Sequence, residues 1–289
     1  MAATDFSFAE NRQPRHPARL LKAAAAYLAA LLATAFFAFP VYWMVASALK
    51  SDVDVAAYPP RWSFEPTLQN FHKLFNELGA WQAFQNSLFI VGIATCLAMI
   101  FGTMAAYALA RFDIGGKNVM AFEILSVRML PPIVSVIPLF IIARQLGLFD
   151  TPWLLIAVYV LNGLPFVVWV MRVFIQEVPQ SIEEAALIDG CSRYECFWRI
   201  TLPLLLPGLA ATMVIVFMFA WNEYLLASIL TSRDARTLPV IAASAIQPKA
   251  ISWGLSSAAG VIMSLPVVVL VLLMQRYLVR GLTLGAVKG

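Results

Sequence analysis

Charged side chains are scarce in this chain: they make up 12% of its 289 residues, whereas 61% are hydrophobic. Soluble domains carry about 25% charged and about 45–50% apolar residues. A sequence with so few charges cannot cover a folded surface in water, which excludes a soluble globular protein. It predicts an integral membrane protein in contact with membrane lipid.

Histidine and cysteine are also rare, with His16, His72 and three cysteines. The sequence contains no Ser/His/Asp set, no cluster of metal ligands and no nucleotide-binding fingerprint. A zinc site at Cys191 and Cys196 lacks the further ligands that it would need. Cys96 falls in an apolar run, and the placement of the three thiols argues against disulfides. We therefore expect no catalytic residues, no metal and no enzyme activity.

The apolar residues are concentrated in six long runs, each long enough for a transmembrane helix of about 20 residues. The runs lie between Lys22 and Lys50, Glu77 and Arg111, Asp150 and Arg172, Arg199 and Glu223, and Lys249 and Arg276, with a further one from Val119 to Ala143. The first run is too long for the apolar part of a signal peptide, which has about 7–15 residues. The expected fold class is therefore an all-α membrane protein with six transmembrane helices, the first of them retained.

Lysine and arginine set the orientation, because cytoplasmic segments of membrane proteins are enriched in them. They are more numerous in the segments that lie inside when the N-terminus is cytoplasmic. We therefore expect both termini in the cytoplasm, residues 1–19 as a cytoplasmic tail and residues 20–289 as a transmembrane domain. The same bias accounts for the net charge of +4 without a nucleic-acid partner.

The loop between the first two runs contains a short amphipathic segment. Phe71, Leu74, Phe75 and Leu78 recur at helical spacing. Such a helix lies either along the outer membrane interface or on the outer rim of the protein itself, and both interpretations are open.

Prolines fall inside two of the runs. Pro131, Pro132 and Pro138 lie in "RMLPPIVSVIP", and "NGLP" occupies residues 162–165. We expect these prolines to kink or break the helices, which membrane proteins tolerate where the backbone lines a cavity or is buried in protein. Arg128 lies beside the first of these sites and serves either a substrate or a structural pair with a polar group on another helix.

A polar segment at residues 178–200 interrupts the apolar sequence. Ser181 and Glu184 have the S-x-x-E spacing of a capping box, which predicts the start of a helix there. Gly190 is expected to end that helix, because glycine adopts the left-handed conformation without a Cβ penalty. Ser192 and Glu195 have the same spacing and predict the start of a second helix that leads back to the membrane.

The first of these helices has the character of a docking site. Ala185 and Ala186 allow a partner to approach the backbone closely, and Glu184 offers a carboxylate to a basic group. The alternative is an amphipathic connector on the inner leaflet. Inner-leaflet anchors are usually basic, whereas this segment is acidic, which favours docking.

The same segment carries a family resemblance. Glu184-Ala185-Ala186, three residues, Gly190, nine residues and then Ile200-x-Leu202-Pro203 match the EAA motif of ATP-binding-cassette importer permeases. With "NSLFIVGIATCLAMIFGTMAAYALARF", "WNEYLLASILTSRDARTLPV" and "QRYLVRGLTLGAVKG", the chain resembles the MalG-like smaller permease subunit of carbohydrate importers, a binding-protein-dependent transport system inner membrane component. The resemblance extends from about Leu20 to the end.

The resemblance implies a bacterial inner membrane complex with a second homologous permease, an ATPase dimer that binds ATP and magnesium, and an extracytoplasmic solute-binding protein. The chain itself would need no cofactor, the loop from Thr231 to Trp253 would face the binding protein, and "GLTLGAVKG" would reach towards the ATPase. The segment would be a cytoplasmic coupling helix seated in a cleft of the ATPase. The residues assigned to coupling are Glu183, Glu184, Ala185, Ala186, Asp189, Gly190, Ile200, Leu202 and Pro203.

Candidates for a sugar pathway share a polar group within or beside an apolar run. They are Arg128, Tyr159, Asn162, Asn222, Glu223 and Tyr224. Helix packing or an interfacial position is the alternative for each. Two other functions are kept: an amino-acid or peptide importer permease, which would share the EAA motif, and an ion-coupled secondary transporter, which predicts internal repeats that this sequence does not display.

Overall fold

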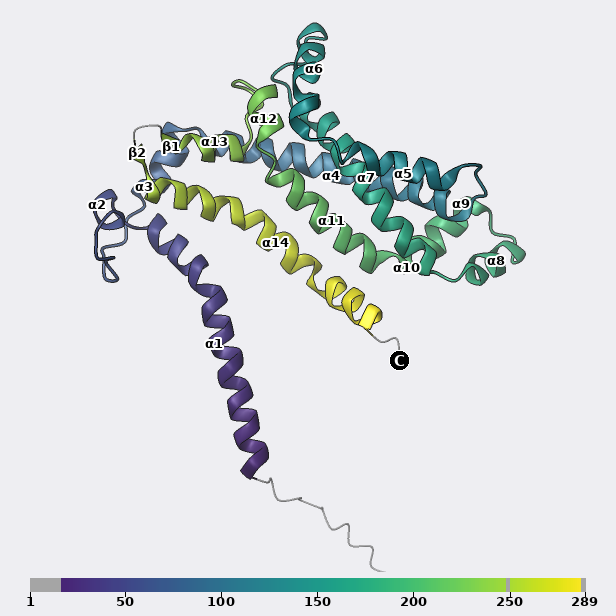
Figure 1. Cartoon of the computed structure of the whole chain (residues 1–289), viewed down its shortest axis with the longest axis horizontal. Coiled ribbons are helices and arrows are strands. Elements are labelled where there is room, and N and C mark those ends of the chain that lie inside the picture. Colours follow the sequence, from purple (N-terminus) through teal and green to yellow (C-terminus); the bar gives the residue numbers. More distant parts are fainter. Residues whose placement is uncertain (1–16, 248–249, 287–289) are drawn as a thin grey trace, which may run out of the picture. The chain divides into compact units, whose positions relative to one another are not determined.

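The computed structural model describes residues 17–247 and 250–286 of the chain (Figure 1). It divides into two compact units, Met1–Ala46 and Ser47–Gly289. The described part of the first unit belongs to helix α1 (Pro17–Ala48). Most of its apolar side chains are exposed, Tyr27 by 78% and Phe36 by 74%, and its length and hydropathy are those of a membrane-spanning helix. Most of the predicted N-terminal tail lies outside the described residues.

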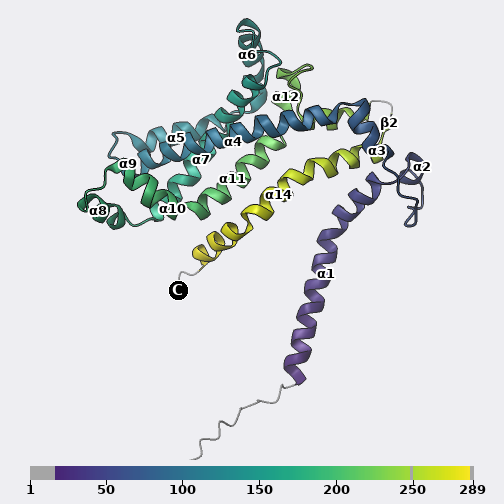
Figure 2. The ribbon, with the colours of Figure 1, turned by 180° about the vertical axis from the view of Figure 1, so that it is seen from behind.

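The second unit is built on four helices that carry most of its apolar sequence. They are α4 (Ala80–Arg111), α7 (Pro152–Glu177), α11 (Leu206–Trp221) and α14 (Trp253–Ala286). Both views show α4 and α7 running side by side (Figures 1 and 2). At Gly102 the helices approach so closely that a Cβ would lie 2.6 Å from Val167 Cγ1. Small residues at such contacts let membrane helices pack backbone to backbone.

Two further pairs of helices are sharply bent. Helices α5 (Lys117–Val127) and α6 (Pro132–Gln145) meet at 82°, and the run 193–204 meets α11 at 75°. The expected break at Pro131 and Pro132 is confirmed, while Pro138 lies inside α6. Among the described residues, four helices are long and apolar enough to cross a membrane, and up to six crossings result if each bent pair counts as one.

The expected break at "NGLP" is wrong. Helix α7 continues from Pro152 to Glu177 with Pro165 in its interior. An interior proline removes one hydrogen bond, but contacts with neighbouring helices compensate for that loss in membrane proteins. Helix α7 packs against both α4 and α11, which supports its backbone on two sides.

Short elements join the long helices. On the side where α4 begins they are α2 (Asp52–Val55), α3 (Gln69–His72), the π-helical turn η1 (Lys73–Glu77), α12 (Leu225–Leu230), α13 (Leu238–Ser244) and the antiparallel strands β1 (Ile246–Gln247) and β2 (Ala250–Ile251). Leu74 of the predicted amphipathic segment is fully buried, and Phe71 and Phe75 pack against the same core. The segment therefore lies on the protein's own rim, as one of the two interpretations held.

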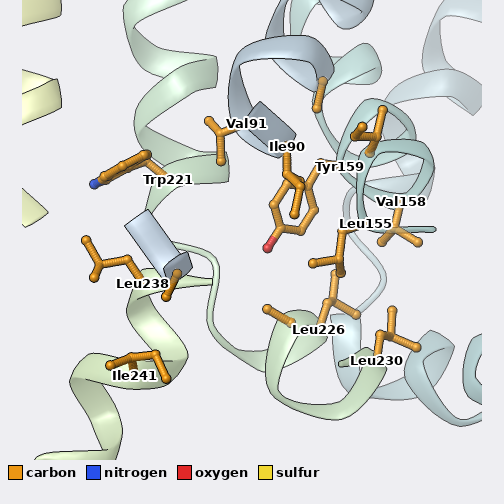
Figure 3. Close-up of a cluster of buried hydrophobic side chains, with 14 of the residues drawn as sticks. Ile90, Val91, Leu155, Val158, Tyr159, Trp221, Leu226, Leu230, Leu238 and Ile241 are labelled. Atoms are coloured by element: carbon orange, nitrogen blue, oxygen red, sulfur yellow. The ribbon is translucent and has the colours of Figure 1, made fainter. Parts of the chain in front are cut away.

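A buried apolar cluster holds α4, α7, α11, α12 and α13 together (Figure 3). Ile90, Leu155 and Trp221 are almost completely buried within it. The indole Nε1 of Trp221 donates a 2.9 Å hydrogen bond to the Met263 carbonyl, which ties α11 to α14. This cluster packs beside the cavity described below and shares Ala94, Tyr159 and Leu226 with its lining.

Candidate functional site

The polar segment folds into helix α8 (Gln180–Ile188), followed by α9 (Arg193–Cys196), the π-helical turn η2 (Phe197–Thr201) and α10 (Leu202–Leu204). In Figures 1 and 2 these elements lie where α4 and α7 end, at the other end of the second unit from α12 and α13. The expected first capping box is wrong: α8 begins after Pro179 without a side-chain cap. Ser181 already lies within the first turn, so it cannot occupy the capping position.

The other two local predictions for this segment are confirmed. Gly190 has a φ of +92°, a left-handed conformation that ends α8 and that side-chain-bearing residues rarely adopt. The Ser192 hydroxyl accepts a 3.2 Å hydrogen bond from the Glu195 backbone N–H. In return the Ser192 backbone N–H donates to Glu195 Oε2 at 3.0 Å. Gly190 therefore lies in the turn between two separate helices, α8 and α9.

Glu183 anchors α8 to the transmembrane helices. Its carboxylate, 7% exposed, accepts hydrogen bonds from Arg111 Nε at 2.9 Å, the Tyr107 hydroxyl at 3.1 Å and the Thr201 hydroxyl at 3.0 Å. Arg111 also donates to the Val178 carbonyl at 2.8 Å. Buried charges are retained when they are paired and hydrogen-bonded in this way. The network fixes α8 relative to α4 and η2.

The opposite face of α8 is open. Glu184, Ala185, Ile188 and Asp189 are exposed, and the Ile188 side chain reaches 86% exposure. Glu184 makes no hydrogen bond or ion pair with any described residue. Residue 188 lies next to residues 184 and 185 on the helix surface, since positions three and four apart are neighbours on a helix. Ala186, by contrast, is buried against the protein.

The last three residues of the EAA motif lie in the run that leads back to the membrane. Ile200 and Leu202 are partly buried, and Leu202 packs against the core that contains Phe197 and Leu205. Pro203 is exposed and lies within the short helix α10. These three residues therefore belong to the connection between α8 and α11 and are not part of the open face of α8.

A cavity of about 300 Å³ opens near the middle of α4. It lies between α4, α7, α11, α12 and the break that separates α5 from α6. Its lining residues are Ala94, Thr95, Arg128, Leu130, Pro132, Tyr159, Asn162, Gly163, Val216, Phe219, Ala220, Glu223 and Leu226. Four of the six predicted pathway residues meet here.

The remaining two predicted pathway residues do not line this cavity. Asn222 is exposed, and its side-chain amide donates to the Met218 carbonyl at 2.8 Å. Tyr224 is 48% exposed and precedes α12. Helix α11 ends at Trp221, so the backbone turns there and carries these two side chains away from the cavity lining.

Arg128 stands at the break between α5 and α6. Its guanidinium lies 5.3 Å from the Phe166 ring centroid and 4.7 Å from that of Phe219, and Nη1 donates to the Asn162 carbonyl at 2.9 Å. None of the ion pairs within 4 Å among the described residues includes Arg128 or Glu123. Each aromatic contact stabilises the guanidinium by about 0.5–2 kcal/mol, whereas removing an ion from water costs several kcal/mol. The two rings therefore offset only part of the cost of burying this charge.

Glu223 lines the same cavity, but its oxygens are occupied. Oε1 accepts from the Leu226 backbone N–H at 2.8 Å, and Oε2 accepts from the Ala227 N–H at 3.0 Å and from the Tyr159 hydroxyl at 3.2 Å. Its carboxylate therefore caps the first turn of α12 and links that helix to α7. The Thr95 hydroxyl, in contrast, is buried and has no hydrogen-bond partner in the described chain.

Asp150 organises the loop between α12 and α13. Its carboxylate accepts four backbone N–H bonds from Ser232, Arg233, Asp234 and Ala235, at 2.9–3.1 Å. Partial burial raises the pKa of this carboxyl, but the four donors together outweigh that effect, and the net pKa lies below its ordinary value. The loop is thereby fixed to the segment between α6 and α7.

Four residues in these sites were not anticipated from the sequence: Tyr107, Arg111, Thr95 and Asp150. The partners Arg111 and Glu183 are 72 residues apart, and no local pattern indicates such a pair. One feature of the sequence could have drawn attention to Asp150, because it is an acidic residue in a turn between two apolar runs. Thr95 is an ordinary helix residue in sequence, and only the cavity distinguishes it.

Comparisons with known proteins place these features in a wider group. Residues 98–284 match the family described as binding-protein-dependent transport system inner membrane component. The chain is 38% identical over 252 residues to the "Probable ABC transporter permease protein y4oR" of Sinorhizobium fredii, covering 87% of this chain and 91% of that one. It is 37% identical over 263 residues to the "Trehalose transport system permease protein SugB" of Mycobacterium tuberculosis, covering 89% and 95%.

A solved structure shares the fold. It is described as a bacterial ABC transporter involved in the import of the acidic polysaccharide alginate, and it aligns with a TM-score of 0.69 at 21% identity. The alignment covers 92% of this chain and 99% of the other. At this level of identity the likeness concerns the fold alone.

Proposed function

This chain belongs to the family of binding-protein-dependent transport system inner membrane components, and from that membership we propose that it is a permease subunit of an ATP-driven carbohydrate importer in a bacterial inner membrane. It forms half of the pathway, and a second, homologous permease forms the other half. A solute-binding protein delivers the sugar from outside, and an ATPase dimer binds ATP and magnesium on the cytoplasmic side. The chain itself performs no hydrolysis.

The observation that carries the proposal is the two-sided construction of α8. One face is anchored through Glu183 to Arg111 and Thr201, while the other presents Glu184, Ala185 and Ile188 to solvent. A helix held in this way transmits a push or pull on its open face to α4 and to the run that enters α11. This is what coupling of an ATPase to alternating access requires of its contact, and the coupling is reciprocal between nucleotide and transport state.

The carbohydrate assignment is supported by the relative named for trehalose transport. A ligand screen of the binding protein separates it from an amino-acid or peptide importer, because only a carbohydrate ligand agrees with the proposal. Uptake that depends on an ion gradient and not on ATP would favour a secondary transporter. The C-terminal segment expected to approach the ATPase extends α14 as far as Ala286, and its last residues lie outside the described chain.

The test is ATPase activity of the complete reconstituted importer, with and without loaded binding protein. We expect Glu184→Lys to reduce the stimulation about tenfold or more, because it reverses the charge on the open face of α8. Glu177→Lys is the matched control, since Glu177 is exposed at the end of α7 but lies outside the motif. Full stimulation in Glu184→Lys would contradict the docking role, provided that the complex assembles normally.

A further inference from the structure

The guanidinium of Arg128 has more hydrogen-bonding capacity than the described residues use. Arginine carries five N–H donors, and the structure gives Arg128 one hydrogen bond, to the Asn162 carbonyl. The rings of Phe166 and Phe219 hold the charge from their faces but accept no conventional hydrogen bond. Donors of a fixed planar fork therefore remain free at the edge of the cavity.

The acid in the same cavity does not supply the missing counter-charge. Glu223 uses its oxygens for the Leu226 and Ala227 N–H groups and for the Tyr159 hydroxyl. It forms no ion pair with Arg128 within 4 Å. The Glu223 carboxylate therefore has hydrogen-bond donors from α12 and α7. The Arg128 guanidinium, in the same cavity, has N–H donors without acceptors among the described residues.

A second unsatisfied group lies on the same wall. Thr95 is 3% exposed and is one of the lining residues, and its hydroxyl has no hydrogen-bond partner in the described chain. Buried hydroxyls without partners are uncommon in folded proteins, but this oxygen is shielded from the cavity and is not a contact for a bound molecule in this structure. A ligand that satisfies the accessible group offers an oxyanion to Arg128.

From this arrangement we propose that the carbohydrate carried through this subunit bears an oxyanion, and that Arg128 binds it. The inference rests on the proposed function, because it names the substrate class of that pathway. A forked guanidinium matches carboxylate, phosphate or sulfonate oxygens in a bidentate manner. Uronic acids, sugar phosphates and sulfonated sugars share this chemistry, whereas a neutral sugar leaves the positive charge in the cavity without a counter-ion.

The test uses the complete importer in lipid nanodiscs, without binding protein or nucleotide. Its thermal unfolding is followed with D-glucuronate, D-galacturonate or glucose 6-phosphate as anionic probes. D-Glucose and D-galactose serve as neutral probes at equal concentration, with sodium chloride added to match ionic strength. We expect at least one anionic probe to raise Tm and the neutral sugars to leave it unchanged.

The variants locate the effect. Arg128→Gln is expected to weaken the apparent affinity for the anionic probe about tenfold to a hundredfold, the usual effect of losing a charged hydrogen bond. Arg128→Lys keeps the charge but loses the fork, so part of the affinity should remain. Arg144→Gln is the matched control, because Arg144 also lies over two phenylalanine rings, Phe140 and Phe149, but does not line the cavity.

Three results would overturn the inference: no Tm rise with any anionic probe, an equal rise with the neutral sugars, or an unchanged rise in Arg128→Gln. Any of them would mean that Arg128 does not recognise an anionic carbohydrate, and that its counter-ion is to be sought in protein, for example in the second permease. A parallel measurement of ATP-dependent uptake separates this failure from that of the proposed function. If carbohydrate is taken up with ATP but uptake is indifferent to Arg128→Gln, the importer assignment stands and the anionic substrate class does not.

Discussion

Glu183 and Glu184 are neighbours in sequence, yet their environments are opposite. The Glu183 carboxylate is enclosed by Arg111, Tyr107 and Thr201, whereas Glu184 projects from the open face of α8. The sequence indicates that an acid is needed in this motif, and it assigned both glutamates to coupling. Which of them faces the protein depends on where α8 begins, and the helix begins at Gln180, one residue before the serine that was expected to cap it.

At this scale the first prediction concerns the anchor. Glu183→Ala is expected to lower the local stability of α8 by about 3 kcal/mol or more, because it leaves the buried Arg111 guanidinium unpaired. Hydrogen exchange of the α8 amides in the assembled importer is the measurement. Glu184→Ala is the control, and its exchange should match that of the unsubstituted protein. Equal exchange in the two variants would show that the ion pair does not hold the helix.

At the scale of elements, the loop between α12 and α13 is shaped by side chains from outside it. Asp150 accepts four of its backbone N–H groups, and the Asn86 side-chain amide donates to the Asp234 and Arg236 carbonyls at 2.8 and 3.1 Å. Asp150 itself has a positive φ of 59°. The sequence predicts that this loop lies on the outer side. It does not predict the hydrogen bonds between Asp150 and residues 82–85 positions further along the chain, because these depend on the packing of α6, α7 and α12.

The loop should respond to pH in a defined direction. The folded pKa of Asp150 is lowered from its ordinary value of 3.8, so its contribution to stability is fully present above that value and is lost as pH falls through the lowered pKa. Protection of the Ser232–Ala235 amides against hydrogen exchange should therefore persist through mildly acidic conditions.

Asp150→Asn isolates the charge, because asparagine also tolerates the left-handed conformation. We expect these amides to exchange about tenfold faster in this variant, since hydrogen bonds to a charged acceptor are the stronger ones. Their protection should also lose its dependence on pH near the carboxyl pKa. Unchanged exchange in the variant would mean that the loop is held by Asn86 and the neighbouring backbone instead.

At the scale of the whole chain, the apolar runs predict the long helices well, because length and hydropathy alone decide whether a segment can span a membrane. The proline break before α6 was also predictable. The continuity of α7 through Pro165 was not, since it depends on helices that pack beside it. The cavity was not predictable either, because it forms only where the break at Arg128 packs beside α7 and α11. Four of its lining residues were identified from the sequence, but only by their polarity.

Orientation remains a prediction from the distribution of lysine and arginine. It can be checked with single-cysteine variants and a membrane-impermeant maleimide on intact cells. Cys191, partly exposed beside α8, should react only after permeabilisation, whereas Ser232→Cys in the α12–α13 loop should react directly. The reverse pattern would place α8 outside and would contradict a role in contact with a cytoplasmic ATPase.

The hydrogen bonds that Asp150 accepts from the loop between α12 and α13 have a practical consequence for antibody reagents. Arg233, Asp234 and Arg236 are exposed on a short stretch of chain whose shape is set by residues distant in sequence. Such a stretch is a conformational epitope, because a linear peptide of the same residues lacks the carboxylate and the amide that fold it. An antibody fragment selected on the native complex should therefore bind this surface in flow cytometry of spheroplasts yet fail on a denaturing blot, which makes it an indicator of correctly folded subunits.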